Sequence, residues 1–516
     1  MIMKPAFIFT DHMMLQRNLP IRVFGEGDGR AEVCLCGRRA AADSADGRWL
    51  VTLPPLPAGG PHVMSITLNG EETLLQDILI GEIFLAGGQS NMEMPVFRTL
   101  GGKQYTETCA NDGIRLFKVP HIWKKDYPVS SWTFEHSTNM DAPWSPACKE
   151  VVPHFSAVGY YFARELQQAL GIPVGVIDCC EGGKVIETFI PYEECRRHKC
   201  LEAPLAAYEE ALSQVDPAEN KVVFEKFAAD SLAYFSACGP KMFDDPLDMG
   251  PRFACGVETM AFSDNGFPGM PYYGPYSSSH PGCLWETMLE RIVPYSFRGV
   301  LWYQGESNGF DRDYKEKYGV MMDAWRRAFQ NPAMPFYACE LAPHNDSVED
   351  NAGWPFLREQ QLAATREYPA NYLATTQELG DEFDIHPLEK DSLAHRLVLL
   401  ALKHTYGRDI PADGPVYRSL EKQGENLLLS FDNVRAFVMR QWPREFYIAG
   451  EDRVFYPAWA GLQGDKILVG SDKVPHPVAV RYCFHQYHKG GNIYNEAGIP
   501  LHPFRTDDWD TVTTAR

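Results

Sequence analysis

Five apolar runs that do not alternate with polar residues are the strongest constraint on how this chain folds. A strand with one face in water alternates, so runs of this kind fit strands that are buried on both faces of a sheet. Patterns with apolar residues at helical spacing lie between them, at 156–171, 314–329 and 357–368. The five runs are EIFLAGG (82–88), PVGVIDCCEGG (173–183), FRGVLWYQGES (297–307), PFYACELA (335–342) and NYLATTQELG (371–380). Strands that alternate with helices predict an α/β fold with a doubly wound, mostly parallel sheet.

The two ends of the chain have a different pattern. Residues 1–78 contain short strand-like segments separated by GDG, ADG, PAGG and NG turn signals, which predicts a β-rich, sandwich-like region. The same pattern of short strand-like segments returns over 413–516, so the α/β domain is expected to cover 79–412. Within that domain, 195–290 includes a long stretch rich in Gly, Pro, Ser and Tyr. Irregular insertions of this length inside a compact domain are usually functional.

The chain is strongly acidic, with 68 Asp and Glu against 48 Lys and Arg and a net charge of −20. Nucleic acids and anionic membranes are bound by basic patches, so neither is expected as a partner. The first residues, MIMKPAFIFTDHMMLQR, show no signal peptide, and no apolar run approaches the length that spans a bilayer. We therefore expect a cytoplasmic protein, and a homo-oligomer stays open.

The thirteen cysteines are scattered along the chain and odd in number. Cys34 and Cys36 are too close in sequence for the usual zinc half-site, and no second half-site follows. We interpret the cysteines as reduced, mostly buried thiols, and we expect neither a metal nor another cofactor.

Polar clusters follow the buried strands. Gly87 to Asn91 follow the first run, and Glu181-Gly182-Gly183 end the second. Gln304 to Asn308 follow the third, and a later loop carries Asp384-Ile385-His386-Pro387. In a doubly wound sheet the carboxyl ends of the strands converge on one crevice, so these clusters are expected to meet.

Acyl transfer needs a set of this composition. A serine hydroxyl becomes a good nucleophile when a histidine takes its proton, and a carboxylate fixes the tautomer of that histidine. Backbone N–H groups at glycine turns can stabilise the oxyanion of the tetrahedral intermediate. Asp384 and His386 are two residues apart, so in extended chain their side chains point to the same side.

Each cluster also has a purely structural interpretation. Ser90 can cap a helix, and DIHP can be a turn before the helical pattern KDSLAHRLVLLALKH. EGG can be a simple turn, and WYQGESN a loop whose Trp302 and Tyr303 belong to the core. All four structural interpretations would have to hold together at the ends of successive elements, which favours the functional one.

The motifs GQSNM, WYQGESN and DIHP, in this order, resemble the sialate O-acetylesterases, a branch of the SGNH-type (GDSL-like) serine esterases that includes carbohydrate acetylesterases. The resemblance runs nearly end to end and implies an SGNH hydrolase-like, flavodoxin-like three-layer fold. It is carried by DHMMLQR (11–17), DGRWLVTLPPLPAGGPH (46–62), GQSNMEMPV (88–96), FSAVGYYFARELQQALGIPVGVID (155–178), GVLWYQGESN (299–308), DIHPLEKDSLAHRL (384–397), VRYCF (480–484) and YNEAGIPLHPFRTD (494–507).

By this resemblance, Ser90 is the nucleophile, His386 the general base and Asp384 the carboxylate that orients it. Asp381 stays open as a substitute for Asp384, although it lies farther from the histidine than the usual triad spacing.

The resemblance also implies the oxyanion donors. They are the backbone N–H of Ser90, the backbone N–H of Gly183 or of its neighbour Gly182, and the side chain of Gln304. The residues expected to shape the site or to brace the Gln304 loop are Gln89, Asn91 and Glu306.

Two positions depart from the family pattern. The glycine pair is usually preceded by tryptophan and followed by threonine, whereas this chain has Glu181 and Lys184 there. The exact substrate is therefore in doubt. A sialic acid carries a carboxylate, and Lys184, Arg98 and Arg327 are candidate cations for it, although each can also be a solvated surface residue.

The resulting hypothesis is a serine esterase that acts on an acetyl ester of a small sugar or oligosaccharide, 9-O-acetylated sialic acid first. Within the same class the alternative is acetylxylan or another neutral sugar. In a different class, the alternative is a sugar-binding module that has lost turnover, and the intact Ser90, Gln304, Asp384 and His386 argue against it. A peptidase or lipase has no support, because 195–290 is too polar for an apolar lid.

Overall fold

The structure is a computed structural model that describes residues 2–120, 144–227, 229–230, 279–345, 353–439 and 441–510. The chain divides into two compact units. The N-terminal unit consists of Met1–Trp302 and Glu316–Phe336, and the C-terminal unit of Tyr303–Lys315 and Tyr337–Arg516. Within the predicted insertion 195–290, residues 231–278 lie outside the described residues.

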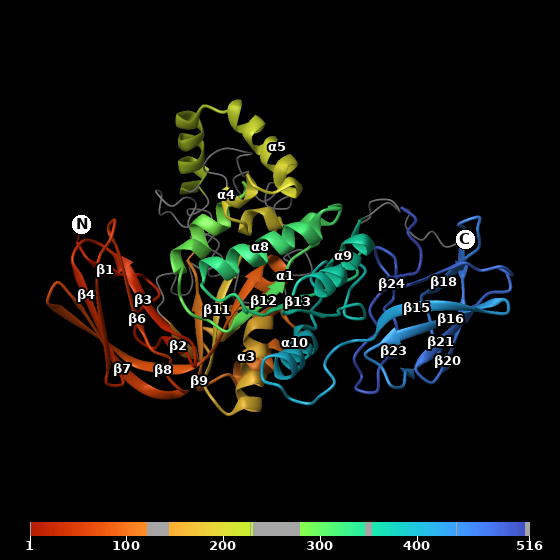
Figure 1. The fold of residues 1–516 in the computed structure, drawn as a ribbon, viewed down its shortest axis with the longest axis horizontal. Coiled ribbons are helices and arrows are strands. Elements are labelled where there is room, and N and C mark those ends of the chain that lie inside the picture. The colour runs from red at the N-terminus through yellow and green to blue at the C-terminus, as the bar shows by residue number, and fades with distance from the viewer. Residues whose placement is uncertain are drawn as a thin grey trace. The chain divides into compact units, whose positions relative to one another are not determined.

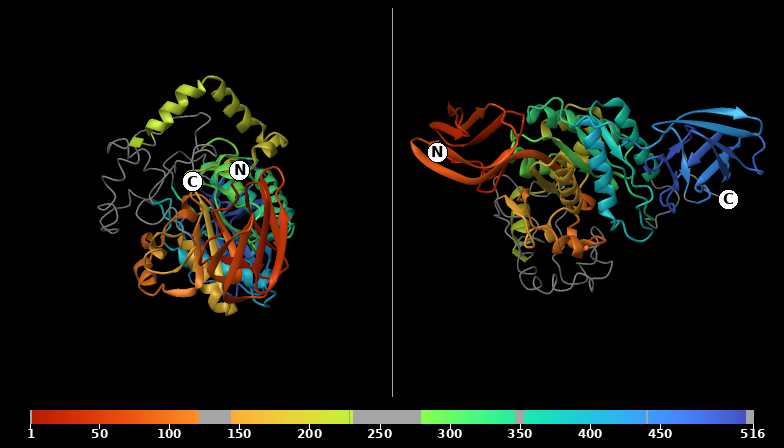
Figure 2. Two further views of the ribbon diagram at one scale, coloured as in Figure 1. Left: turned by 90° about the vertical axis from the view of Figure 1, so that its left-hand side faces the viewer. Right: turned by 90° about the horizontal axis from the view of Figure 1, so that it is seen from below.

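Two antiparallel sheets form the amino-terminal part of the N-terminal unit. Strands β1 (Lys4–Pro5), β3 (Ile21–Glu26) and β6 (Arg48–Leu53) make one sheet, and β4 (Arg30–Leu35), β5 (Arg38–Asp43) and β7 (Gly59–Leu68) belong to the other. Strand β6 shows why they pack, because Trp49, Val51 and Leu53 alternate with exposed residues and point to a buried interior. Strands β5 and β6, one from each sheet, contact each other. The strands of this region are drawn in red in Figure 2.

Strand β8 (Glu71–Gly88) connects this region to the central sheet of the same unit. It pairs with β7 near its start and with β11 (Val174–Cys180) near its end, so the predicted boundary between residues 78 and 79 falls inside one continuous strand. The strand order is β10-β9-β11-β8-β12, and β2 (Met14–Gln16) also pairs with β8. The other strands are β9 (Asn111–Lys118), β10 (Ser145–Ala147) and β12 (Gly299–Tyr303).

Parallel pairing and full burial explain the apolar runs. Strand β11 lies parallel to both β8 and β9, and all of its residues are buried. Helix α3 (Ala157–Leu170) packs on β11 and β9 (Figure 1). Its predicted limits are confirmed: the Ser156 side chain accepts a hydrogen bond from the Gly159 N–H at the start, and Gly171 ends the helix at φ 66°.

The C-terminal unit begins with a second α/β portion. Strand β13 (Phe336–Cys339) pairs with β14 (Asn371–Ala374), and helices α9 (Trp354–Glu367) and α10 (Lys390–His404) pack on β14. Figure 1 labels β13 and the two helices. Both strands and both helices correspond to predicted segments.

The carboxyl-terminal part of this unit is β-rich. One sheet has the order β15-β16-β21-β20 and another β19-β18-β22-β24, with β17 and β23 as a separate pair. They share a core in which Leu429, Ile448, Val469 and Val480 are fully buried. The strands are β15 (Val416–Gln423), β16 (Asn426–Asp432), β17 (Val438–Met439), β18 (Phe446–Ala449), β19 (Phe455–Pro457), β20 (Trp459–Gln463), β21 (Lys466–Gly470), β22 (Ala479–Tyr482), β23 (Ile493–Tyr494) and β24 (Phe504–Arg505).

Short helical segments complete the described chain. They are α1 (Ser90–Glu93), η1 (Val96–Arg98), α2 (Gly102–Glu107), η2 (Val152–His154), η3 (Ile186–Phe189), α4 (Tyr192–Cys195), η4 (Lys199–Leu201), α5 (Glu202–Ser213), η6 (Trp285–Leu289), η7 (Glu290–Ile292), η8 (Glu306–Asn308) and the longer α8 (Tyr314–Ala328). Among the described helices, none has the length and apolar character needed to cross a bilayer. The prediction of mixed sheets and helices, with β-rich regions towards both ends of the chain, is confirmed.

Candidate active site

The turn that carries Ser90 follows directly on the end of β8. Gly88 has φ 135°, a conformation that favours glycine, and Gln89 is extended before Ser90 opens helix α1. Gln89 occupies the N-cap position, without a capping hydrogen bond from its side chain, and Ser90 is the first residue of the helix, so the interpretation of Ser90 as the cap is wrong. The Glu93 N–H donates to the Gln89 carbonyl at 3.0 Å, which closes the first turn.

Ser90 and its two amide neighbours are buried within the N-terminal unit. Gln89 is 3%, Ser90 5% and Asn91 0% exposed. A nucleophile in this position would be shielded from bulk water.

The glycine pair lies beside Ser90. In the parallel register of β11 and β8, Cys180 is opposite Gly88, so both strands end together. The Glu181 N–H then donates to the Gly88 carbonyl at 3.1 Å. A Cβ atom built on Gly182 would lie 3.4 Å from the Ser90 Cβ, which is ordinary van der Waals contact. The expectation that these two clusters meet is therefore confirmed for Ser90 and Gly182.

Gly183 needs to be glycine for a conformational reason. Its φ is 70°, the left-handed value that a type II turn requires at its third position. A Cβ atom at this position would find nothing within 4 Å among the described residues. Backbone conformation, and not crowding, selects glycine here.

Lys184 forms a buried ion pair with Glu181, the other residue that departs from the family pattern. The Lys184 Nζ lies 2.9 Å from Glu181 Oε1 and donates to the Ser279 hydroxyl at 3.2 Å. The two side chains are each 5% exposed. Of the other candidate cations, Arg327 pairs with Glu194 at 3.1 Å and is 60% exposed.

Two buried thiols precede the glycine turn. Burial, followed by the charge of Asp178, raises the pKa of the Cys179 and Cys180 thiols well above the ordinary value. Both remain protonated at neutral pH, and a thiol without its thiolate is a weak nucleophile. Ser90 is therefore the better nucleophile candidate at this turn.

In the C-terminal unit, Asp384 and His386 lie together as predicted from their spacing. The backbone N–H of His386 donates to Asp384 Oδ1 at 2.8 Å, and the His386 ring Nδ1 is 3.6 Å from the same oxygen. That second distance is longer than a hydrogen bond. His386 is 2% exposed, so its imidazole is shielded from water.

Asp381 has a different position in this loop. Its carboxylate accepts hydrogen bonds from the backbone N–H of Phe383 at 2.8 Å and of Asp384 at 3.0 Å. Asp381 thus holds the turn on which Asp384 is carried, which favours Asp384 as the partner of His386.

Gln304 is fixed by three residues, none of which was assigned a role from the sequence. Its Nε2 donates to Asn308 Oδ1 at 2.7 Å. Its backbone carbonyl accepts from the Tyr314 hydroxyl at 3.1 Å and from Gln361 Nε2 at 3.2 Å. Asn308 lies in the WYQGESN motif and could have been found there, whereas nothing in the sequence marked Tyr314 or Gln361.

Glu306, expected to brace the Gln304 loop, begins the short helix η8. After burial, its charge is the next cause that raises the pKa of the Tyr303 hydroxyl well above the ordinary value. Lys390 carries the opposite charge, and its Nζ lies 5.2 Å from the centre of the Tyr303 ring. The role of Glu306 as a brace of the Gln304 loop stays a prediction.

The predicted site residues are thus distributed over both units. Ser90, Gln89, Asn91, Gly182 and Gly183 lie in the N-terminal unit, and Gln304, Glu306, Asp384 and His386 in the C-terminal unit. The complete triad stays a prediction. In the described part of the chain, no group of three or more His, Cys, Asp or Glu side chains is arranged to hold a metal ion.

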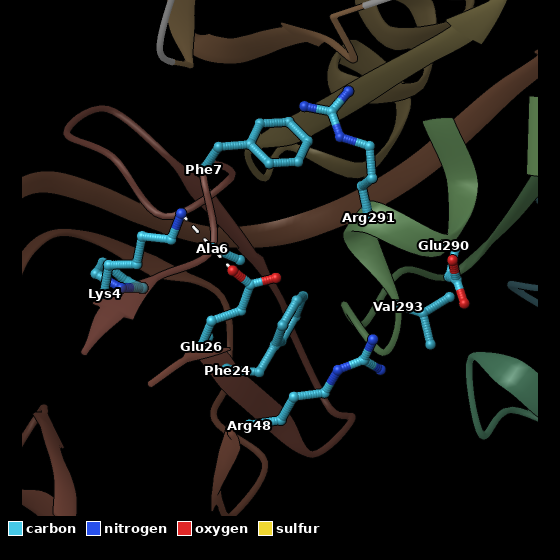
Figure 3. A pocket seen from close by; sticks show the side chains of 11 residues that line it. Lys4, Ala6, Phe7, Phe24, Glu26, Arg48, Glu290, Arg291 and Val293 are labelled. Carbon is cyan, nitrogen blue, oxygen red and sulfur yellow. Dashed lines mark ion pairs between the residues drawn. The ribbon is translucent and has the colours of Figure 1, made fainter. Parts of the chain in front are cut away.

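A pocket of about 370 Å³ lies in the N-terminal unit, between strands β1 and β3 and residues 290–293 (Figure 3). Lys4 and Glu26, which are partners in the β1–β3 register, form an ion pair at 3.7 Å in its lining. Arg291 lies over the Phe7 ring and donates to the Pro120 carbonyl at 2.7 Å. None of the residues predicted for catalysis is among those that line this pocket.

Comparison with known proteins supports the assignment made from the motifs. Residues 277–398 match the family model described as carbohydrate esterase, sialic acid-specific acetylesterase. The sialate O-acetylesterase of Rattus norvegicus is 25% identical over 465 residues, which cover 82% of this chain and 78% of the rat protein. That of Mus musculus is 26% identical over 469 residues, with the same two coverages.

A solved structure extends this likeness over the whole chain. The crystal structure of a carbohydrate acetylesterase from Xanthomonas citri matches with a TM-score of 0.76 at 28% identity, over 98% of this chain and 100% of that one. The resemblance to the sialate O-acetylesterase family is confirmed, and the chain is a carboxylic ester hydrolase related to the carbohydrate acetylesterases.

Proposed function

We propose that this protein is a serine esterase that removes O-acetyl groups from carbohydrate through an acyl-enzyme, with 9-O-acetylated sialic acid as its preferred substrate. The observation that carries the proposal is the contact of Gly182 with Ser90 where the parallel strands β8 and β11 end together. A serine beside a turn rich in backbone N–H groups is the arrangement that acyl transfer needs. The names of the rat and mouse relatives support the sialate substrate.

The proposed reaction has two steps. Ser90 Oγ attacks the acetyl carbonyl while His386 takes the hydroxyl proton, and Asp384 stabilises the imidazolium. The oxyanion is held by backbone N–H groups and by the Gln304 amide until the sugar leaves with the proton from His386. Water, activated by the same histidine, then attacks the acetyl group on Ser90 and releases acetate.

We also propose that the central sheet is doubly wound in the manner of the SGNH hydrolases, in a flavodoxin-like three-layer fold. The parallel pairing of β8, β11 and β9 and the packing of α3 on β11 support this arrangement. Ligands of such sheets bind at the carboxyl ends of the strands, where Ser90 and Gly182 lie.

A neutral acetylated sugar, such as acetylxylan, is the second candidate substrate. It is favoured by the Lys184–Glu181 ion pair, because the cation nearest to the glycine turn already has a carboxylate partner. A substrate carboxylate would have to compete with Glu181 for that ammonium group.

Acetate release from a panel of three substrates tests the proposal. The panel holds 9-O-acetyl sialic acid, an acetylated xylo-oligosaccharide and an aryl acetate. We expect all three to be hydrolysed and 9-O-acetyl sialic acid to have the highest kcat/KM. A higher kcat/KM for the xylo-oligosaccharide would indicate a neutral sugar as the preferred substrate. Hydrolysis of the aryl acetate alone would refute a carbohydrate substrate.

Lys184→Ala is expected to lower kcat/KM on 9-O-acetyl sialic acid and on the aryl acetate by a similar factor. The substitution leaves the Glu181 carboxylate buried without its ammonium partner, which typically costs about 3–5 kcal/mol and disturbs the glycine turn for every substrate. Kinetics on both esters and the melting temperature measure the effect.

The double variant Glu181→Gln, Lys184→Met is the matched control, because it removes both charges and retains the side-chain volumes. Its melting temperature should recover most of the loss. If Lys184→Ala instead weakened only the sialic acid ester, by about ten- to a hundredfold, Lys184 would be the residue that binds the substrate carboxylate.

A further inference from the structure

Glu93 lies one helical turn after Ser90 and faces the glycine turn. Helix α1 contains only Ser90–Glu93, so the two residues stand at i and i+3, on the same side of the helix. Glu93 was not assigned a role from the sequence, although it belongs to the stretch GQSNMEMPV.

The Glu93 carboxylate accepts a hydrogen bond from the Gly182 backbone. The Gly182 nitrogen is 2.8 Å from Glu93 Oε2, the length of a charge-assisted bond. A Cβ atom on Gly182 would be 3.4 Å from both Glu93 Oε2 and the Ser90 Cβ. Glu93 therefore joins the turn after β11 to the turn after β8 at the nucleophile.

This bond restricts which backbone group can serve as an oxyanion donor. An N–H that is already given to a carboxylate is a poor donor to a developing oxyanion, because it would first have to break a strong bond. The sequence left the N–H groups of Gly182 and Gly183 open as oxyanion donors. The bond to Glu93 excludes Gly182, so the N–H of Gly183, whose φ is 70°, remains.

Lys118, at the end of β9, stabilises the charge of the Glu93 carboxylate. Its Nζ lies 3.8 Å from Glu93 Oε1 and 3.8 Å from Asp178 Oδ2. The Asp178 side chain is 0%, Lys118 20% and Glu93 29% exposed, so this row of charges is partly shielded from water. Attraction between charges is stronger where water is excluded, which restricts the positions open to Glu93.

We propose that Glu93 is a positioning residue for the oxyanion hole: it binds the Gly182 N–H, so that the Gly183 N–H is directed to the acyl oxygen beside Ser90. Lys118, which also pairs with Asp178, holds the Glu93 carboxylate in this position. The proposal rests on the serine esterase mechanism proposed above.

Two substitutions of Glu93, measured on an aryl acetate, test the proposal. Glu93→Ala removes the acceptor, and kcat should fall by about a hundred- to a thousandfold, the usual effect of losing an oxyanion donor. KM should stay within about threefold, because the oxyanion forms only on the way to the transition state. Glu93→Gln keeps an oxygen that accepts from Gly182, and its kcat should stay within about tenfold of the wild type.

Glu187→Ala is the matched control, since Glu187 is a buried carboxylate five residues after Gly182 in the chain and pairs with Lys317 at 2.6 Å. It should lower the melting temperature and leave kcat within about threefold.

Two results would overturn the role of Glu93. One is an unchanged kcat in Glu93→Ala. The other is an equal loss of kcat in Glu93→Ala and Glu93→Gln together with a fall in melting temperature as large as that of Glu187→Ala, which would show a structural role only. Failure of the serine esterase mechanism would be seen separately, as undiminished turnover of the aryl acetate by Ser90→Ala.

Discussion

Ser90→Ala is expected to lower kcat on an aryl acetate by about three orders of magnitude or more, with little change in folding. In the proposed mechanism the serine oxygen forms the acyl-enzyme, and the neighbouring thiols of Cys179 and Cys180 cannot replace it, because burial keeps them protonated. The melting temperature should stay within a few degrees, because only one oxygen atom is removed. Steady-state kinetics and calorimetry measure these two effects, and mass spectrometry of the wild-type protein after treatment with an organophosphonate identifies the labelled residue.

Ser296→Ala provides a matched control for this variant. Ser296 is 6% exposed, so it resembles Ser90 in burial, and its hydroxyl donates a structural hydrogen bond to the Pro20 carbonyl at 2.6 Å. Loss of this hydrogen bond should lower the free energy of unfolding by about 1 kcal/mol and leave kcat within about twofold. Near-normal turnover in Ser90→Ala, or labelling of another residue by the phosphonate, would assign the nucleophile elsewhere.

The fold of the α/β portions could be predicted where each element is governed by local chemistry. Helix α3 begins at Ser156 and ends at Gly171, because the serine satisfies an N–H of the first turn and the glycine adopts the left-handed conformation. The apolar run at 173–183 became strand β11, since burial on both faces removes polar residues from both.

Continuity between regions could not be predicted in the same way. The change in sequence pattern near residue 78 predicted a domain boundary, yet β8 runs from Glu71 to Gly88 without a break. Its first half pairs with β7 in an antiparallel sheet and its second half with β11 in a parallel one. The two halves differ in burial and therefore in composition, although the backbone is the same strand.

The candidate site shows a similar division between what is local and what is not. The spacing of Asp384 and His386 predicted their contact, because two residues in a turn cannot move far apart. The role of Lys184 was left open between binding a substrate carboxylate and a solvated surface position, and the structure instead buries it in an ion pair with Glu181. The residues that fix Gln304 come from three separate segments, of which only one contains a recognisable motif.

The burial of Ser90 is a further feature that its motif does not reveal. Ser90 is 5% exposed and lies beside Gly182. The reason is that β8 and β11 end in register, so each turn covers the other. Register between strands about ninety residues apart depends on the whole sheet and cannot be read from a short motif.

His386→Ala is the second substitution with a large expected effect, a loss of about three orders of magnitude or more in kcat/KM. In the wild type, kcat/KM should rise with pH through the pKa of an imidazole, ordinarily about 6.5, and then level off. The sign follows from the mechanism, because only the neutral ring can accept the proton of Ser90, and the neutral form is populated above that pKa. The residual activity of His386→Ala should lack this rise, which a pH series on the aryl acetate from about pH 5 to 9 would measure.

His404→Ala is the control that separates a catalytic histidine from a structural one in the same unit. His404 also contacts a carboxylate, with its Nε2 2.9 Å from Asp413 Oδ1, and is 22% exposed. Burial alone would raise the pKa of Asp413, but hydrogen bonds from His404 and Lys403 lower it to about 2, so this pair contributes to stability. That contribution is present above the ordinary aspartate pKa of about 3.9 and is lost as the pH falls towards 2. His404→Ala should therefore lower the melting temperature at neutral pH and keep the wild-type rise of kcat/KM with pH. If the rise persisted in His386→Ala and disappeared in His404→Ala, the general base would be His404, and Asp413 would take the position assigned to Asp384.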